Sequence, residues 1–131
     1  MGAQHRMKAL TLGTRLLLPL AAAAALVVIM ACASAQSRTA TWYGEPYHGR
    51  PTASGETFDM HALTAAHHSL AFGTLVRVTN PSNGRSVVVR INDRVPRRSR
   101  CAIDLSREAF SRIAPLQQGR VPVEIEVLSA P

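Results

Sequence analysis

The sequence predicts a small, mainly β domain with one short helix, and three observations carry this prediction. Short runs rich in Val and Thr recur along the chain, clusters of Gly, Pro and Asn separate them, and a single segment has the pattern of a capped helix. Five or six strands of this length usually close into a barrel or pack as a sandwich, and chain order alone leaves both open. The 131 residues allow one such domain.

The strands are predicted from composition and from alternation of apolar and polar residues. Two Val-rich runs, 75–80 and 86–92, flank a turn in which Asn83-Gly84 favours a hairpin because both residues tolerate positive φ. The run 121–128 alternates, with Val123, Ile125 and Val127 on one face. Further strands are expected at 39–43 and 102–105, and a weaker one near 62–65.

The helix is predicted to begin after Ser106, which can cap it, and to run from Arg107 to about Ala114. Glu108 in its first turn suits the helix dipole, and Pro115 ends it. The Gly- and Pro-rich segment 44–55 is expected to be a loop, with a tight turn at 52–55.

Residues 1–35 are predicted to be a signal peptide, which leaves 36–131 as the folded domain. A basic start precedes an apolar run at 16–30, and Ala33-Ser34-Ala35 allows cleavage before Gln36. The apolar run is shorter than the roughly 20 residues of a membrane-spanning helix, although an uncleaved anchor is an alternative. The segment ending at Cys32 resembles a lipoprotein signal, in which that cysteine carries the lipid. The protein is therefore expected to be exported, to the periplasm or cell envelope.

The net charge of +7 falls to about +4 in the predicted mature domain, which has twelve basic and eight acidic residues. This excess favours an acidic polymer, an anionic membrane surface or nucleic acid, or is only a solvated basic surface. Export argues against nucleic acid, and we expect membrane contact only through the signal or a lipid anchor. Cys101 is then the only cysteine of the domain, so no disulfide framework is expected.

Asp93 is the first candidate for chemistry, because it follows an apolar strand. If that strand extends one residue, Asp93 falls on the face of Val87, Val89 and Ile91, at the rim of the core. Desolvation there is expected to raise its pKa, as a general acid for a glycosidic bond requires. The alternative is a carboxylate that caps a turn or pairs with Arg94.

Glu56, Asp59 and His67 form a second group of candidates, each of which is commonly a loop acid or a hydrogen-bonded structural histidine when it occurs alone. His61 and His68 lie near them, but the spacing matches no zinc motif, so no metal and no cofactor are predicted.

Aromatic residues at the first predicted strand and its loop suggest a binding surface. Such side chains could stack on sugar rings and form hydrogen bonds with the sugar hydroxyls, and the candidates are Trp42, Tyr43, Tyr47 and His48. The alternative for Trp42 is that it fills the core.

Several motifs in order make the chain resemble the rare lipoprotein A family over about residues 40–128. They are Ala40-Thr41-Trp42-Tyr43-Gly44, His48-Gly49-Arg50-Pro51-Thr52-Ala53-Ser54-Gly55-Glu56, Leu63-Thr64-Ala65-Ala66-His67, Val76-Arg77-Val78-Thr79-Asn80, Val89-Arg90-Ile91-Asn92-Asp93-Arg94 and Ile103-Asp104-Leu105-Ser106. The chain has Val95 where the family usually has Gly.

This resemblance implies a six-stranded double-psi β-barrel and a lytic transglycosylase acting on peptidoglycan glycan strands. We also expect the protein to be a monomer. It implies that Asp93 is the catalytic acid and base and that His67 orients it or stabilises charge. Glu56 and Asp59 would support them in the cleft. Substrate contacts are expected from the aromatic set and Arg94, and 1,6-anhydro-MurNAc is the expected product. A glycan-binding or wall-loosening module of expansin type is the alternative.

Overall fold

The computed structural model describes residues 38–131 of the protein. The predicted signal peptide, its cleavage site and Cys32 lie outside the described residues, so their assignments stay predictions. Within the described part, six strands close into a barrel, which confirms the mainly β prediction and decides for a barrel over a sandwich.

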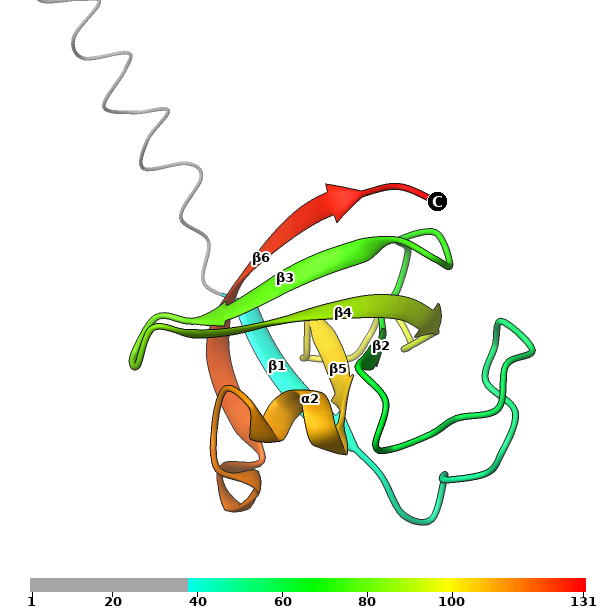
Figure 1. Ribbon diagram of the computed structural model, residues 1–131, viewed down its shortest axis with the longest axis horizontal. Helices are drawn as coiled ribbons and strands as arrows, with labels where there is room; N and C mark the ends of the chain where they lie inside the picture. The colour runs from blue at the N-terminus through cyan, green and yellow to red at the C-terminus, as the bar shows by residue number, and fades with distance from the viewer. Residues whose placement is uncertain (1–37) are drawn as a thin grey trace, which may run out of the picture. The chain divides into compact units, whose positions relative to one another are not determined.

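The barrel has the strand order β1-β5-β2-β4-β3-β6 (Figure 1). Two of its pairings are parallel, β1 with β5 and β2 with β4, so strands distant in sequence become neighbours. The strands are β1 (Arg38–Tyr43), β2 (Thr64–Ala66), β3 (Leu75–Asn80), β4 (Arg85–Asp93), β5 (Ile103–Ser106) and β6 (Arg120–Ser129).

The β3–β4 hairpin forms where the Asn-Gly pair predicts it. Gly84 has a φ of 74°, and its N–H donates to the Asn80 carbonyl at 2.9 Å. A side chain at that φ would be strained, so the glycine allows the tight reversal that sets the register of the two strands. Figure 1 shows the two strands side by side along the barrel wall.

The core fills the barrel with alternate side chains of the strands. Val76, Val78, Val89 and Ile91 are almost fully buried, and Phe110 of the helix packs against them. Apolar alternation continues along β6, but Val127 is 52% exposed because the strand extends beyond the core at that end.

The helix α2 (Arg107–Ser111) is shorter than predicted. Ser106 caps it as expected, accepting from the Ala109 N–H. The prediction that it continues to Ala114 is wrong, because the next turn tightens: Ile113 N–H bonds to Phe110 O, and the Ile113 carbonyl accepts from Asn80 Nδ2 instead of continuing a helix. A 3₁₀ turn, η1 (Leu116–Gln118), follows.

Strand β4 extends to Asp93, as predicted, but the prediction that Asp93 shares the core face of Ile91 is wrong, because Ile91 pairs with Ala65 of the core and Asp93 pairs with Ala66, which points to the opposite face. Against β2, however, it carries one extra residue: Ala65 pairs with Ile91 and Ala66 with Asp93. Asn92 lies at this bulge and is buried. Bulges often redirect a side chain beside a functional site, and this one places Asp93 next to the end of β2.

Candidate functional site

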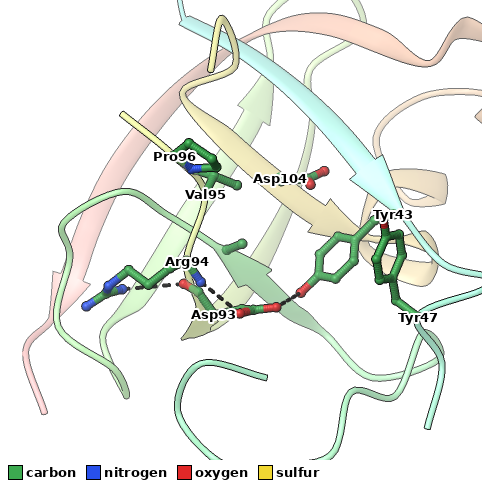
Figure 2. A pocket seen from close by; sticks show the side chains of 8 residues that line it. Tyr43, Tyr47, Asp93, Arg94, Val95, Pro96 and Asp104 are labelled. Carbon is green, nitrogen blue, oxygen red and sulfur yellow. Dashed lines mark hydrogen bonds between the residues drawn. The ribbon is translucent and has the colours of Figure 1, made fainter. Parts of the chain in front are cut away.

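A pocket of about 240 Å³ lies over β1, β2, β4 and β5, between the loops that follow β1 and β4. It is smaller than most pockets that bind small molecules. Figure 2 shows the side chains around it. The lining residues are Tyr43, Tyr47, Ala66, Asp93, Arg94, Val95, Pro96 and Asp104.

Three hydrogen bonds hold the Asp93 carboxyl in this pocket. Its Oδ2 accepts from the Tyr43 hydroxyl at 3.0 Å, and its Oδ1 accepts from the backbone N–H groups of Ala53 and Arg94, each at 2.9 Å. Figure 2 shows the Tyr43 hydroxyl pointing at the carboxyl. These three donors fix the position of the carboxyl and leave both of its oxygens as hydrogen-bond acceptors facing the pocket.

Tyr43 joins the acid to an aromatic stack. Its ring stacks on Phe58 with centroids 4.2 Å apart, and Tyr47 meets it edge-on at 6.1 Å. Burial, and then the neighbouring Asp93 charge, raise the pKa of the Tyr43 hydroxyl, so it keeps its proton and acts as the donor. Tyr47 is 52% exposed and free to meet a ligand. The sequence placed both tyrosines in the binding group but missed the Tyr43–Asp93 bond.

Glu56 fastens the 52–56 turn to the barrel wall. Its carboxylate pairs with the Arg90 guanidinium through two bonds of 2.6 and 2.9 Å and accepts from Asn92 Nδ2 at 3.2 Å. The Arg90 bonds hold the pKa of Glu56 below its usual range. The same turn carries the Ala53 N–H that bonds Asp93. Glu56 therefore reaches the acid indirectly, by positioning a backbone donor.

His67 lies beside Asp93 but points its ring into its own loop. Its Nδ1 accepts from the N–H groups of Ser69 and Leu70 at 3.1 and 3.0 Å, and the residue is 4% exposed. Burial, and then nearby cations, lower the pKa of His67 to about 4. The ring is thus neutral near pH 7, which argues against a charge-stabilising cation. Its backbone N–H donates to the Asp93 carbonyl at 3.2 Å, which supports an orienting role.

Arg94 turns its guanidinium away from the Asp93 carboxyl. The group lies 4.0 Å over the Phe72 ring and donates, at 3.4 Å, to the backbone carbonyls of His67 and Asp93. The alternative of an Asp93–Arg94 side-chain ion pair is therefore not what the structure shows. Arg94 lines the pocket and remains a candidate for contact with a ligand.

The other predicted site residues lie outside the pocket lining. Asp59 accepts from the His61 N–H and lies 4.0 Å from His48, whose Nδ1 accepts from the Met60 N–H. Trp42 packs on the core and donates to the Leu116 carbonyl, which supports its core-filling alternative.

No group of three or more His, Cys, Asp or Glu side chains within residues 38–131 is arranged to hold a metal ion.

Asp104 is the pocket residue that sequence reasoning missed. It lies in β5 between the buried Ile103 and Leu105, so alternation suggests an ordinary outward-facing polar residue. Its Oδ1 accepts from the Thr41 hydroxyl at 3.0 Å. Burial, and then the Asp93 charge, raise the pKa of Asp104 to about 6, although the Thr41 bond opposes this. The signal that could have found it is the acid within the Ile103–Ser106 motif.

Relatives of this chain share its barrel region. Residues 35–125 match the family model described as lytic transglycolase. The chain is 47% identical over 91 residues to the endolytic peptidoglycan transglycosylase RlpA of Neisseria meningitidis serogroup A, covering 70% of this chain and 38% of that protein. It is 58% identical over 85 residues to a probable RlpA of Nostoc, covering 65% and 23%. The chain thus spans well under half of these relatives.

Solved structures give the same architecture. The Streptomyces papain inhibitor matches with a TM-score of 0.59 and 26% identity over 72% of this chain and 94% of its own. An expansin of Clavibacter michiganensis, solved with cellohexaose, matches with a TM-score of 0.59 and 22% identity over 73% and 51%. The second likeness concerns the fold alone. Together with the closed barrel and the family match, they confirm the double-psi β-barrel, and the chain belongs to the lytic transglycolase family.

Proposed function

We propose that this domain is a peptidoglycan lytic transglycosylase that cleaves between MurNAc and GlcNAc and leaves 1,6-anhydro-MurNAc ends. The observation that carries the proposal is the Asp93 carboxyl, fixed by three hydrogen bonds in a pocket beside exposed Tyr47. The family match and the names of the relatives support the substrate class.

The pocket's residues supply the parts that this reaction needs. A glycan strand would lie across the pocket with one sugar against Tyr47 and Tyr43, whose faces suit the apolar side of a pyranose. The MurNAc C6 hydroxyl attacks its own C1, and Asp93 takes the proton that the hydroxyl loses. The nucleophile is internal, so no carboxylate is needed to activate water, in contrast to ordinary glycoside hydrolysis.

The leaving GlcNAc oxygen must gain a proton as the glycosidic bond breaks. Sequence reasoning assigns both proton transfers to Asp93. Both oxygens of the Asp93 carboxyl already accept hydrogen bonds, from two backbone N–H groups and the Tyr43 hydroxyl, and this geometry supports its role as the proton acceptor.

The test is incubation of purified glycan strands, with and without stem peptides, followed by mass spectrometry of the products. We expect anhydro-MurNAc ends from the parent protein and from a control, Glu124→Gln, which alters an exposed β6 residue. Asp93→Asn should lose these products while it still binds the strands. If the parent protein binds glycan without cleaving it, the expansin-type alternative replaces the enzyme.

We further propose that the domain acts in the cell envelope as a monomer. The predicted signal peptide and the net positive charge, which suits an anionic wall polymer, support this. None of the helices in the described part of the chain could span a bilayer. Cys32 as a lipid anchor is tested by metabolic labelling with a fatty acid: labelling that survives Cys32→Ser would exclude that anchor.

A further inference from the structure

Asp104 and Asp93 face the same pocket from two sides of one residue. Ala66 of β2 pairs with Asp104 of β5 on one side and with Asp93 of β4 on the other. Directly paired residues point to the same face of a sheet, so both carboxyls rise on the face where Ala66 contributes only a methyl group. Two strand spacings separate their backbones by roughly 10 Å. Side chains that lean toward each other across this gap can reach the separation of about 5 to 9.5 Å found for carboxyl pairs in glycosidases.

The surroundings of Asp104 differ from those of Asp93. Asp93 accepts three hydrogen bonds, two of them from backbone N–H groups, whereas Asp104 has one bond, from the neutral Thr41 hydroxyl. No Arg of residues 38–131 lies within ion-pairing distance of Asp104. The ionisable groups around it are Asp93, Tyr43 and, on the pocket rim, Arg94. Pairs of carboxyls whose environments differ in this way divide the acid and base roles between them.

A structural role explains Asp104 poorly. A partly buried carboxyl without a cationic partner weakens a fold unless hydrogen bonds compensate, and a single hydroxyl compensates little. Its strand neighbours Ile103 and Leu105 already fill the core. A functional role therefore explains this pocket-lining acid, which has no cationic partner, better than a structural role does.

We propose that Asp104 is the catalytic acid of the reaction and that Asp93 is its base. Asp104 gives its proton to the glycosidic oxygen as the C1–O bond breaks, and the GlcNAc end leaves as an alcohol. The MurNAc C6 oxygen forms the new bond to C1, and its proton passes to Asp93. The products then depart, and exchange with solvent returns a proton to Asp104 and removes one from Asp93. No redox partner or added nucleophile is required.

The proposal rests on the transglycosylase function, and its test separates the two. The substrates are natural glycan strands and a MurNAc-ended oligosaccharide that carries 4-nitrophenol at C1, a leaving group that needs no protonation. Asp104→Asn should lower kcat/KM on natural glycan by about 10²–10⁴-fold and recover most of its rate on the nitrophenyl substrate. Asp93→Asn should be slow on both, and Glu124→Gln should match the parent.

The pH dependence of kcat/KM is a further measurement, and a purely structural role of Asp104 would leave it unchanged. A general acid must be protonated, so the rate of the parent should fall on the alkaline side as Asp104 ionises. Thr41→Val removes the bond that favours ionised Asp104, and should move that alkaline limb to higher pH.

The outcomes are distinguishable. A parent protein that makes no anhydro ends contradicts the transglycosylase function itself. An active parent with an equally active Asp104→Asn on natural glycan overturns only the role of Asp104. So does an Asp104→Asn that is equally impaired on both substrates although circular dichroism shows it folded.

Discussion

Replacing Asp104 with Asn should stabilise the domain at neutral pH, because the pocket holds a carboxyl that folding makes harder to ionise. Burial and the Asp93 charge raise its pKa from the ordinary 3.8 to about 6. Such a difference corresponds to about 3 kcal/mol of folding free energy above pH 7, which partial exposure reduces to roughly 2 kcal/mol. Asn keeps an oxygen for the Thr41 hydroxyl and removes the charge.

The direction of this stability change with pH follows from proton binding at Asp104. Between pH 4 and 6 the folded state binds more protons at Asp104 than the unfolded state does, so its contribution to stability is fully present below pH 4 and is lost as the pH rises through about 6. The advantage of Asp104→Asn should therefore be near zero at pH 4 and reach about 2 kcal/mol at pH 7.5.

Urea unfolding of the two proteins at both pH values measures this difference, since the other titrating groups largely cancel in the comparison. A gain of 2 kcal/mol corresponds to a Tm increase of about 10 °C for a domain of this size. A stability difference between the two proteins that does not change with pH, or a less stable Asp104→Asn at pH 7.5, would refute the reasoning that folding disfavours the ionised form of Asp104.

Three further predictions concern the groups around Asp93. Glu56→Gln should lower kcat about tenfold, because it loosens the turn that carries the Ala53 N–H, and should cost under 1 kcal/mol of folding free energy. Steady-state kinetics measures the first effect and urea unfolding measures the second. An unchanged kcat would contradict this role of Glu56. Tyr43→Phe keeps the ring stack but removes the hydrogen-bond donor to Asp93, so kcat should fall by a larger factor than the affinity for glycan. Steady-state kinetics measures kcat, and a glycan pull-down measures the affinity. Equal losses in both would instead assign Tyr43 to binding. The His67 imidazole should stay neutral until the pH falls to about 4 in nitrogen-15 NMR, and a titration near its usual 6.5 would contradict the claim that burial keeps the ring uncharged.

Local sequence signals predicted much of the fold. Val-rich runs, the Asn83-Gly84 turn and the Ser106 cap gave strand and helix starts within a residue or two, because each depends on neighbours in sequence. The end of the helix was wrong since Asn80, from another strand, captures the Ile113 carbonyl. Chain order could not show that the barrel closes through two parallel pairings.

The site was only partly predictable for the same reason. Asp93 stood out because it ends an apolar strand, but its donors Tyr43 and Ala53 are 50 and 40 residues away. Asp104 looked like any outward-facing strand residue, and only its pairing with Ala66 places it in the pocket. Asp59 and Trp42 were grouped with the site because they lie close in sequence to Glu56 and Tyr43, whereas the structure gives them partners outside the pocket lining.

The central claim, non-hydrolytic cleavage by an internal nucleophile, is tested most directly by digesting glycan strands in water enriched in heavy oxygen. Mass spectrometry of the new MurNAc ends should show 1,6-anhydro rings that contain no heavy oxygen and have lost the mass of one water relative to a reducing end. Reducing MurNAc ends that carry heavy oxygen at C1 would mean that water is the nucleophile. In that case the two pocket carboxyls would serve hydrolysis, and the proposed transglycosylase reaction would be contradicted.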